Sequence, residues 1–114
     1  MDCLIDHYNR SCDLYGVGAC ESGNLTFTED GPDLEGLRIN YEWLKKNYNS
    51  DELSQILCES DSLSVNKEQS FFYLYGMSWC DHIRELKEHT DVHSPPQLRV
   101  NGVVTQMPEF SNAF

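Results

Sequence analysis

Near its end the chain reads TDVHSPPQLRVNG from Thr90 to Gly102 and MPEF from Met107 to Phe110, and it closes on Ala113-Phe114. The first of these stretches places His93 six residues before Arg99, with two prolines stiffening the backbone between them. An imidazole held beside a permanently charged guanidinium suits a site that binds a polarised carbonyl group. His93 and Arg99 are therefore candidate catalytic residues.

The composition excludes several classes of partner. The 114 residues carry 8 Lys and Arg against 19 Asp and Glu, which gives a formal net charge of −11. This balance argues against nucleic acid, because phosphate binding needs clustered basic side chains, and it also disfavours anionic membrane surfaces. No run of about 18 apolar residues is present, so no transmembrane segment is expected. The first residues lack the basic start and the apolar stretch of a signal peptide.

The cysteines and two sequons indicate an oxidising, extracellular origin. Five cysteines are many for a small cytosolic domain: Cys3, Cys12, Cys20, Cys58 and Cys80. None forms a C-x-x-C pair, which argues against a structural zinc site. Cys12 and Cys20 are close enough to close a local loop, and the odd count leaves at least one thiol free or paired outside the chain. Asn9 and Asn24 begin N-x-S/T sequons and are candidate glycosylation sites.

The length allows a single domain, residues 1–114, and helical periodicity begins at Pro32. Apolar residues then recur at steps of three and four and form one stripe: Leu34, Leu37, Tyr41, Leu44 and Tyr48. Pro32 fits the first turn of this helix, where its missing N–H costs nothing, and residues 47–51 end it. Residues 1–10 could form the end of a preceding helix. Residues 11–28 contain three glycines and are predicted to form a loop.

Three further elements are predicted after residue 60. Asn66 and Gln69 resemble a capping box that opens a helix to about Cys80, and the apolar residues surround this helix so fully that we expect it to be buried. A short helix is predicted over residues 82–88. Because the proline pair disfavours a helix, residues 98–104 are predicted to be a short extended segment, before a last helix that starts at Pro108. The predicted fold class is mainly α.

Two acids form a second candidate site. Glu29 and Asp33 are four residues apart, so a helical backbone would put both carboxylates on one face. One carboxylate could bind a metal while the other orients a histidine ligand. Such pairs are common in a chain with 19 acids, and the alternative interpretation is an ordinary helix start enriched in acids.

These motifs together resemble the C-terminal part of zinc metallopeptidases of the neprilysin and endothelin-converting enzyme type. In that family a Glu-Asn-x-x-Asp motif precedes Gly-Gly-Leu, and EDGPDLEGL (Glu29–Leu37) aligns with it without a gap. The resemblance implies that Glu29 is a zinc ligand and that Asp33 is a catalytic acid. It also implies that His93 stabilises the oxyanion and that Arg99 binds a substrate carbonyl, within the C-terminal portion of a gluzincin catalytic domain.

The resemblance also has consequences for the cysteines and the partners. It implies that Cys3 and Cys80 pair with cysteines outside this sequence. The partners it implies are peptide substrates and the missing N-terminal half of the peptidase domain. Since the apolar stripe of residues 34–44 and the helix of residues 71–79 would pack against that half, the isolated chain is expected to expose apolar surface.

Two departures from the family pattern bear on zinc. Asp30 stands where the family has Asn, and Gly31-Pro32 occupies positions that are normally helical. Proline disfavours helical geometry in the residue before it, so we expect the helix to begin at Pro32 and Glu29 to lie in the loop ahead, away from a zinc site.

The sequence contains no H-E-x-x-H motif. Catalytic zinc needs three protein ligands and a water, and this chain offers Glu29 at most. The predicted function is that of the C-terminal portion of a zinc metalloendopeptidase that cleaves extracellular peptides, secreted or in the ectodomain of a type II membrane protein, and inactive and free of zinc as this chain alone. The alternative is a non-catalytic extracellular binding or structural module that retains the peptidase fold.

Overall fold

The computed structural model describes residues 2–15, 20, 22–80 and 92–114. Its elements follow in the order α1 (Asp2–Asn9), α2 (Ser11–Tyr15), α3 (Gly23–Asn47), α4 (Ser50–Leu53), β1 (Ile56–Ser60), β2 (Leu63–Asn66), α5 (Lys67–Ser78), α6 (Pro96–Val104) and α7 (Pro108–Ala113). The fold is mainly α, as the sequence predicts, and β1 and β2 form an antiparallel hairpin. The helix predicted over residues 82–88 lies outside the described residues.

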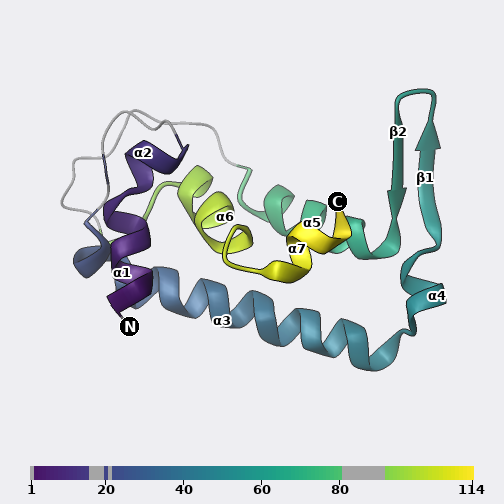
Figure 1. The fold of residues 1–114 in the computed structure, drawn as a ribbon, viewed down its shortest axis with the longest axis horizontal. Coiled ribbons are helices and arrows are strands. Elements are labelled where there is room, and N and C mark those ends of the chain that lie inside the picture. The colour runs from purple at the N-terminus through teal and green to yellow at the C-terminus, as the bar shows by residue number, and fades with distance from the viewer. Residues whose placement is uncertain (1, 16–19, 21, 81–91) are drawn as a thin grey trace.

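The long helix α3 organises the molecule (Figure 1). Helices α1 and α2 lie at its beginning, α4 and the projecting hairpin lie at its far end, and α5, α6 and α7 lie along one side. The apolar stripe of α3 faces these last three helices and forms the core with them: Leu34, Leu37, Tyr41, Phe72, Val103, Val104 and Met107. The stripe is therefore covered within this chain, contrary to the expectation that it would lose its partners.

Helix α3 begins nine residues before Pro32, so the prediction that the helix starts at Pro32 and leaves Glu29 in a loop is wrong. The steric conflict that proline creates falls partly on the Cβ of the preceding residue, and Gly31 has none. A proline inside a helix still costs about 3 kcal/mol. Packing of α1 on α3 offsets this cost, since the Leu4 side chain of α1 lies beside Gly31.

Contacts with α1 also explain why residues 23–31 are helical although a loop was predicted there. The Gly23 amide donates to Oδ1 of Asn9 at 2.8 Å. A Cβ on Gly23 would lie 2.2 Å from the carbonyl oxygen of Ile5, so this close helix approach requires glycine. The prediction of a loop over residues 11–28 is also wrong at α2, and the predicted helix over residues 1–10 is confirmed as α1.

The extended segment predicted over residues 98–104 is likewise wrong, because these residues lie in α6. Pro95 is extended, with φ −55° and ψ 149°, and serves as the N-cap, so the proline pair begins the helix. Proline is favoured in the first helical turn, where no N–H is needed. The amides of Leu98 and Arg99 both donate to the Pro95 carbonyl, and the buried Leu98 and Val103 anchor α6 on the core.

Helix α5 begins at the predicted capping box. Asn66 Oδ1 accepts from the Gln69 amide at 2.8 Å, and the Gln69 side chain accepts from the Asn66 amide at 3.0 Å. The prediction that this helix is buried is wrong, since only Phe72 is fully covered while Tyr73, Leu74 and Met77 are exposed. In the described part of the chain, no helix is long and apolar enough to cross a membrane.

Candidate functional site

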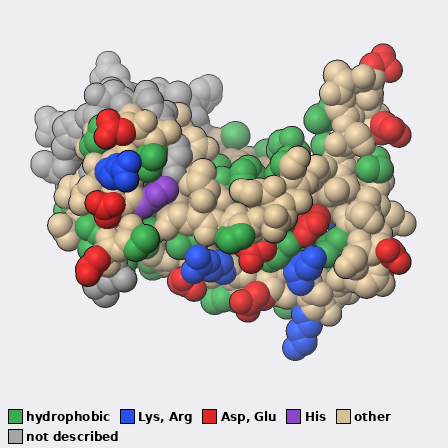
Figure 2. Space-filling model, viewed as in Figure 1, with side chains coloured by type: hydrophobic (Ala, Val, Ile, Leu, Met, Phe, Trp, Pro, Cys, Tyr) green, Lys and Arg blue, Asp and Glu red, His purple; other side chains and the backbone are tan. Residues whose placement is uncertain are grey.

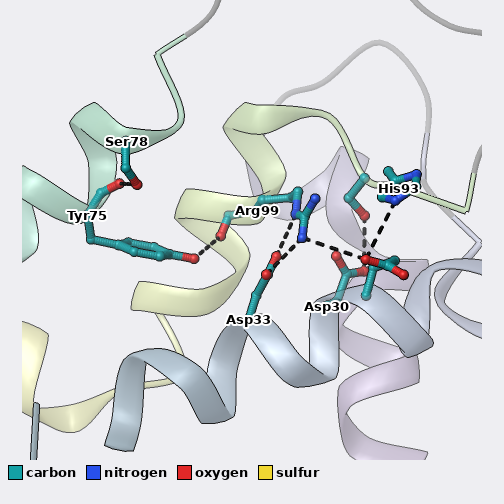
Figure 3. A network of polar contacts seen from close by, with 8 residues as sticks. Asp30, Asp33, Tyr75, Ser78, His93 and Arg99 are labelled. Carbon is teal, nitrogen blue, oxygen red and sulfur yellow. Dashed lines mark hydrogen bonds and ion pairs between the residues drawn. The ribbon is translucent and has the colours of Figure 1, made fainter. Parts of the chain in front are cut away.

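Helices α3 and α6 bring the four predicted site residues together. Glu29 and Asp33 lie one turn apart on α3, so both carboxylates face the same side, as the spacing predicts for a helix. Arg99 projects from α6 toward Asp33, and His93 lies in the segment that leads into α6 (Figure 3). The site therefore joins two motifs that lie far apart in the sequence, since Asp33 and Arg99 are 66 positions apart.

The strongest contact in the site is the ion pair between Asp33 and Arg99. Arg99 Nε donates to Asp33 Oδ2 at 2.5 Å, and its NH2 donates to Oδ1 at 2.8 Å. The two side chains are only 13% and 15% exposed, so water screens the pair little. Hydrogen bonding to Asp33 raises the pKa of Arg99, although burial opposes the effect. This two-pronged geometry fixes the plane of the guanidinium.

Glu29 connects the ion pair to His93. Its Oε2 lies 3.6 Å from His93 Nε2 and 3.9 Å from Arg99 NH2. The Glu29 side chain is 36% exposed and the His93 side chain is 51% exposed, so these longer contacts contribute little to stability. Their main consequence is placement: the partly exposed carboxylate and imidazole lie beside the largely buried guanidinium. Asp91, two residues before His93 in the sequence, lies outside the described residues.

Asp30 is a member of this network that sequence reasoning recognised only as a departure from the family pattern. Its side chain is fully buried, and its Oδ2 accepts from the Ser94 hydroxyl at 3.0 Å. No hydrogen bond within the described residues reaches its Oδ1. Burial raises the pKa of Asp30 to about 6, and the nearby hydroxyl groups of Thr26 and Ser94 reduce this effect. The bond to Ser94 ties the segment carrying His93 to α3.

Tyr75 and Trp79 are two further contacts of Arg99 that sequence reasoning missed. The Tyr75 hydroxyl donates to the Arg99 backbone carbonyl at 2.8 Å. The guanidinium carbon of Arg99 lies 4.0 Å from the centre of the Trp79 ring. The sequence did contain a signal, since both aromatic residues are four positions apart at the end of a predicted helix, but nothing local showed that this face meets Arg99.

The other predicted residues lie away from this cluster. Cys12 and Cys20 form a disulfide, while Cys3, Cys58 and Cys80 are exposed thiols. Asn24 is exposed in the first turn of α3, and the Asn9 side chain accepts the hydrogen bond from the Gly23 amide.

The donor set of this cluster fits only part of a zinc site. Among residues 2–15, 20, 22–80 and 92–114, no group of three or more His, Cys, Asp or Glu side chains is arranged to hold a metal. The Glu29 carboxylate is accessible and lies on one turn of α3 beside Asp33, so it can supply one ligand. A catalytic zinc needs three protein ligands, so further ligands must come from elsewhere.

The arrangement can hold and polarise a carbonyl group. A guanidinium carries five N–H donors, and in the described part of the chain the hydrogen bonds and ion pairs of Arg99 run through Nε and NH2. The donors of NH1 therefore remain for a ligand oxygen. An imidazolium at His93 would add a second positive group nearby, of the kind that stabilises a developing oxyanion.

Comparison with known proteins identifies a family and several relatives of this chain. Residues 1–114 match the family described as peptidase family M13. The chain is 33% identical to neprilysin-1 of Caenorhabditis elegans over 116 residues, covering 98% of this chain and 15% of that protein. It is 32% identical to endothelin-converting enzyme 1 of Rattus norvegicus over 122 residues, covering 99% of this chain and 15% of that protein.

A third relative is named as a glycoprotein and not as an enzyme. The chain is 33% identical to the Kell blood group glycoprotein of Homo sapiens over 91 residues, which is 80% of this chain and 12% of that protein. The chain thus spans 12–15% of the length of these relatives. No solved structure matches it significantly.

Proposed function

This chain belongs to peptidase family M13, and we propose that it supplies the substrate-holding side of a zinc metalloendopeptidase site that acts on extracellular peptides. The observation that carries this proposal is the position of Arg99. Two hydrogen bonds to Asp33 fix its guanidinium. Glu29 lies 3.9 Å from Arg99, and His93 lies 3.6 Å from Glu29. Helix α3 runs unbroken through Pro32, so Glu29 lies within the helix and not in a loop ahead of it.

Arg99 would hold the carbonyl of a bound peptide. The ion pair with Asp33 leaves the guanidinium charged and oriented before any ligand arrives, so little side-chain entropy is lost on binding. His93 would act on the scissile carbonyl itself. Its Nε2 lies 3.6 Å from the Glu29 carboxylate, and an imidazolium at this place would stabilise negative charge on the carbonyl oxygen.

Glu29 would provide one zinc ligand, and the others would come from outside the described residues. Zinc, when bound, polarises a carbonyl and lowers the pKa of a bound water. Asp33 lies one turn from Glu29 and is held by Arg99, so its proposed role is to fix the guanidinium and the electrostatics beside the metal. The 114 residues alone would then neither retain zinc nor hydrolyse peptides.

The surface chemistry supports an extracellular location. Cys3 and Cys80 are exposed thiols, available for disulfides with cysteines elsewhere in the same protein. Asn24 is exposed, and Asn9 uses only its carbonyl oxygen in the bond with Gly23, which leaves its nitrogen for a glycan. We propose a secreted protein or the ectodomain of a type II membrane protein.

A chimera tests the proposal. Residues 1–114 would replace the matching segment of rat endothelin-converting enzyme 1, and hydrolysis of a fluorogenic peptide would be measured. Zinc-dependent hydrolysis that Glu29→Gln abolishes is the expected result. Glu35→Gln, an exposed change on the same helix, is the matched control.

The competing function is a non-catalytic binding or structural module. The buried Asp30 carboxyl, in a position where the family pattern has Asn, is the observation that favours it. The chimera would then fold and bind the peptide as tightly as the parent enzyme, but it would retain no zinc and show no turnover. This result would establish the module function and contradict the peptidase proposal.

A further inference from the structure

The C-terminal end of α5 contacts Arg99 at two places. Tyr75 lies in the last turn of α5, and Trp79 is the C-cap residue of that helix, four positions later. Their rings meet edge to face, with centroids 6.5 Å apart. Figure 3 shows the Tyr75 ring reaching across to the backbone of α6, where its hydroxyl donates to the Arg99 carbonyl at 2.8 Å. One aromatic residue thus holds the Arg99 main chain.

The second aromatic residue covers the Arg99 head group. The guanidinium carbon lies 4.0 Å from the centre of the Trp79 ring, well within the range of a cation–π contact. Asp33 holds the Nε–NH2 edge of the same group, and the Arg99 side chain is only 13% exposed. Edge contact and face contact together restrict rotation about the last side-chain bonds, which either contact alone would leave partly free.

We propose that Trp79, supported by Tyr75, is the positioning residue that sets the plane of the Arg99 guanidinium for a peptide carbonyl. The inference rests on the proposed substrate-holding function of Arg99. Without the indole face, the guanidinium could tilt about its bonds to Asp33, and its remaining N–H donors would no longer converge on one oxygen. Trp79 acts through Arg99, so its effect on substrate must vanish when the planar guanidinium is absent.

Steady-state kinetics of the chimera described above tests this dependence. Trp79→Leu should raise KM roughly 3- to 30-fold, the factor that a cation–π contact represents, and change kcat much less. Trp79→Phe keeps a ring face and should recover most of the loss. In an Arg99→Lys background, Trp79→Leu should have no further effect, because lysine offers no plane to orient. Equal losses in both backgrounds would overturn the proposal. Tyr73→Leu removes an exposed α5 aromatic away from Arg99 and is the matched control.

Fluorescence of the 114-residue chain provides an independent test of the contact between Arg99 and Trp79. Trp43 is 61% exposed on α3, and Trp43→Phe leaves Trp79 as the only tryptophan. If Arg99 covers the indole, Arg99→Ala should increase acrylamide quenching of Trp79 several-fold, with a smaller increase for Arg99→Lys. Unchanged quenching in dilute, folded protein would overturn the contact and with it the proposal. An inactive chimera with the expected quenching would instead contradict the proposed peptidase function and end the substrate role of Trp79.

Discussion

Arg99 and Asp33 form a two-pronged ion pair that joins α6 to α3 across 66 positions of sequence. The pair lies beside Asp30 and His93 (Figure 3) and 3.9 Å from Glu29, and both of its side chains are largely shielded from water. Removing one charged side chain leaves the other charge partly buried without a partner. The pair therefore links the stability of the chain to the geometry of its candidate site.

The first prediction concerns this linkage. Asp33→Ala should lower the free energy of unfolding by about 2–4 kcal/mol, because Arg99 would keep its charge without a partner. Urea denaturation measures the change. The exposed pair Arg38–Glu35, at 44% and 63% exposure, is the matched control, and Glu35→Ala should cost less than about 1 kcal/mol. Equal effects at the two pairs would show that the buried pair contributes no more than a surface pair.

The second prediction concerns pH. The pKa of Asp30 is raised from 3.8 to about 6 in the folded chain, so the folded state binds more protons than the unfolded state between these values. Stability should therefore fall as pH rises from about 4 to about 6, by up to about 3 kcal/mol. Asp30→Asn should remove this slope and stabilise the chain at pH 7.

Thermal melts over that pH range provide the measurement for Asp30. Asp61→Asn, in the exposed turn between β1 and β2, removes one carboxylate from the same acidic chain and is the matched control. Equal changes in melting temperature for Asp30→Asn and Asp61→Asn at every pH would show that burial of Asp30 does not affect stability.

Helix α5 was predicted to be buried and instead exposes Tyr73, Leu74 and Met77. Figure 2 shows hydrophobic side chains gathered between the body of the molecule and the projecting hairpin, whose Ile56, Leu57 and Leu63 are also exposed. Exposed apolar patches of several hundred Å2 mark partner surfaces. The third prediction is that the isolated chain binds a hydrophobic dye and self-associates.

The double change Leu74→Ser and Met77→Ser should reduce this dye binding without loss of helix content. Leu37→Ser, at a buried position of the core, should instead unfold the chain and increase dye binding. A wild-type chain that stays monomeric, binds no dye and melts in one sharp transition would show that the patch needs no partner.

The sequence predicted best what depends on neighbouring residues. The capping box of Asn66 and Gln69 is confirmed because both of its hydrogen bonds lie within four residues. The apolar stripe of α3 is confirmed at Leu34, Leu37 and Tyr41, because its spacing of three and four residues is also a local pattern. The projecting hairpin was not predicted, since all five residues of β1 are exposed and carry no alternating pattern.

The proline rules failed where tertiary structure changed their outcome. Pro32 is accommodated because Gly31 lacks a Cβ and packs against Leu4 and Phe27 from other turns. Pro96 starts α6 instead of preventing it, and the core contacts of Leu98 then hold the helix. The roles of Trp79 and Tyr75 depend on the meeting of α5 with α6, which no local pattern encodes.

The fourth prediction concerns His93. In the active chimera, His93→Gln should lower kcat roughly 100-fold, because oxyanion stabilisation acts mainly in the transition state. Peptide affinity should change much less. Single-turnover kinetics separates the two quantities, and a loss confined to affinity would assign His93 to substrate binding instead of chemistry.

In the proposed site, Arg99 holds a substrate carbonyl through its planar donors. Its most direct measurement is the affinity of the chimera for a non-hydrolysable peptide, compared between wild type and Arg99→Lys by calorimetric titration. Lysine keeps the charge but cannot reproduce the two-pronged geometry, so binding should weaken by about 1–3 kcal/mol. Equal affinity of the two proteins would contradict a substrate-holding role for Arg99 and would leave the Arg99–Asp33 pair a purely structural role.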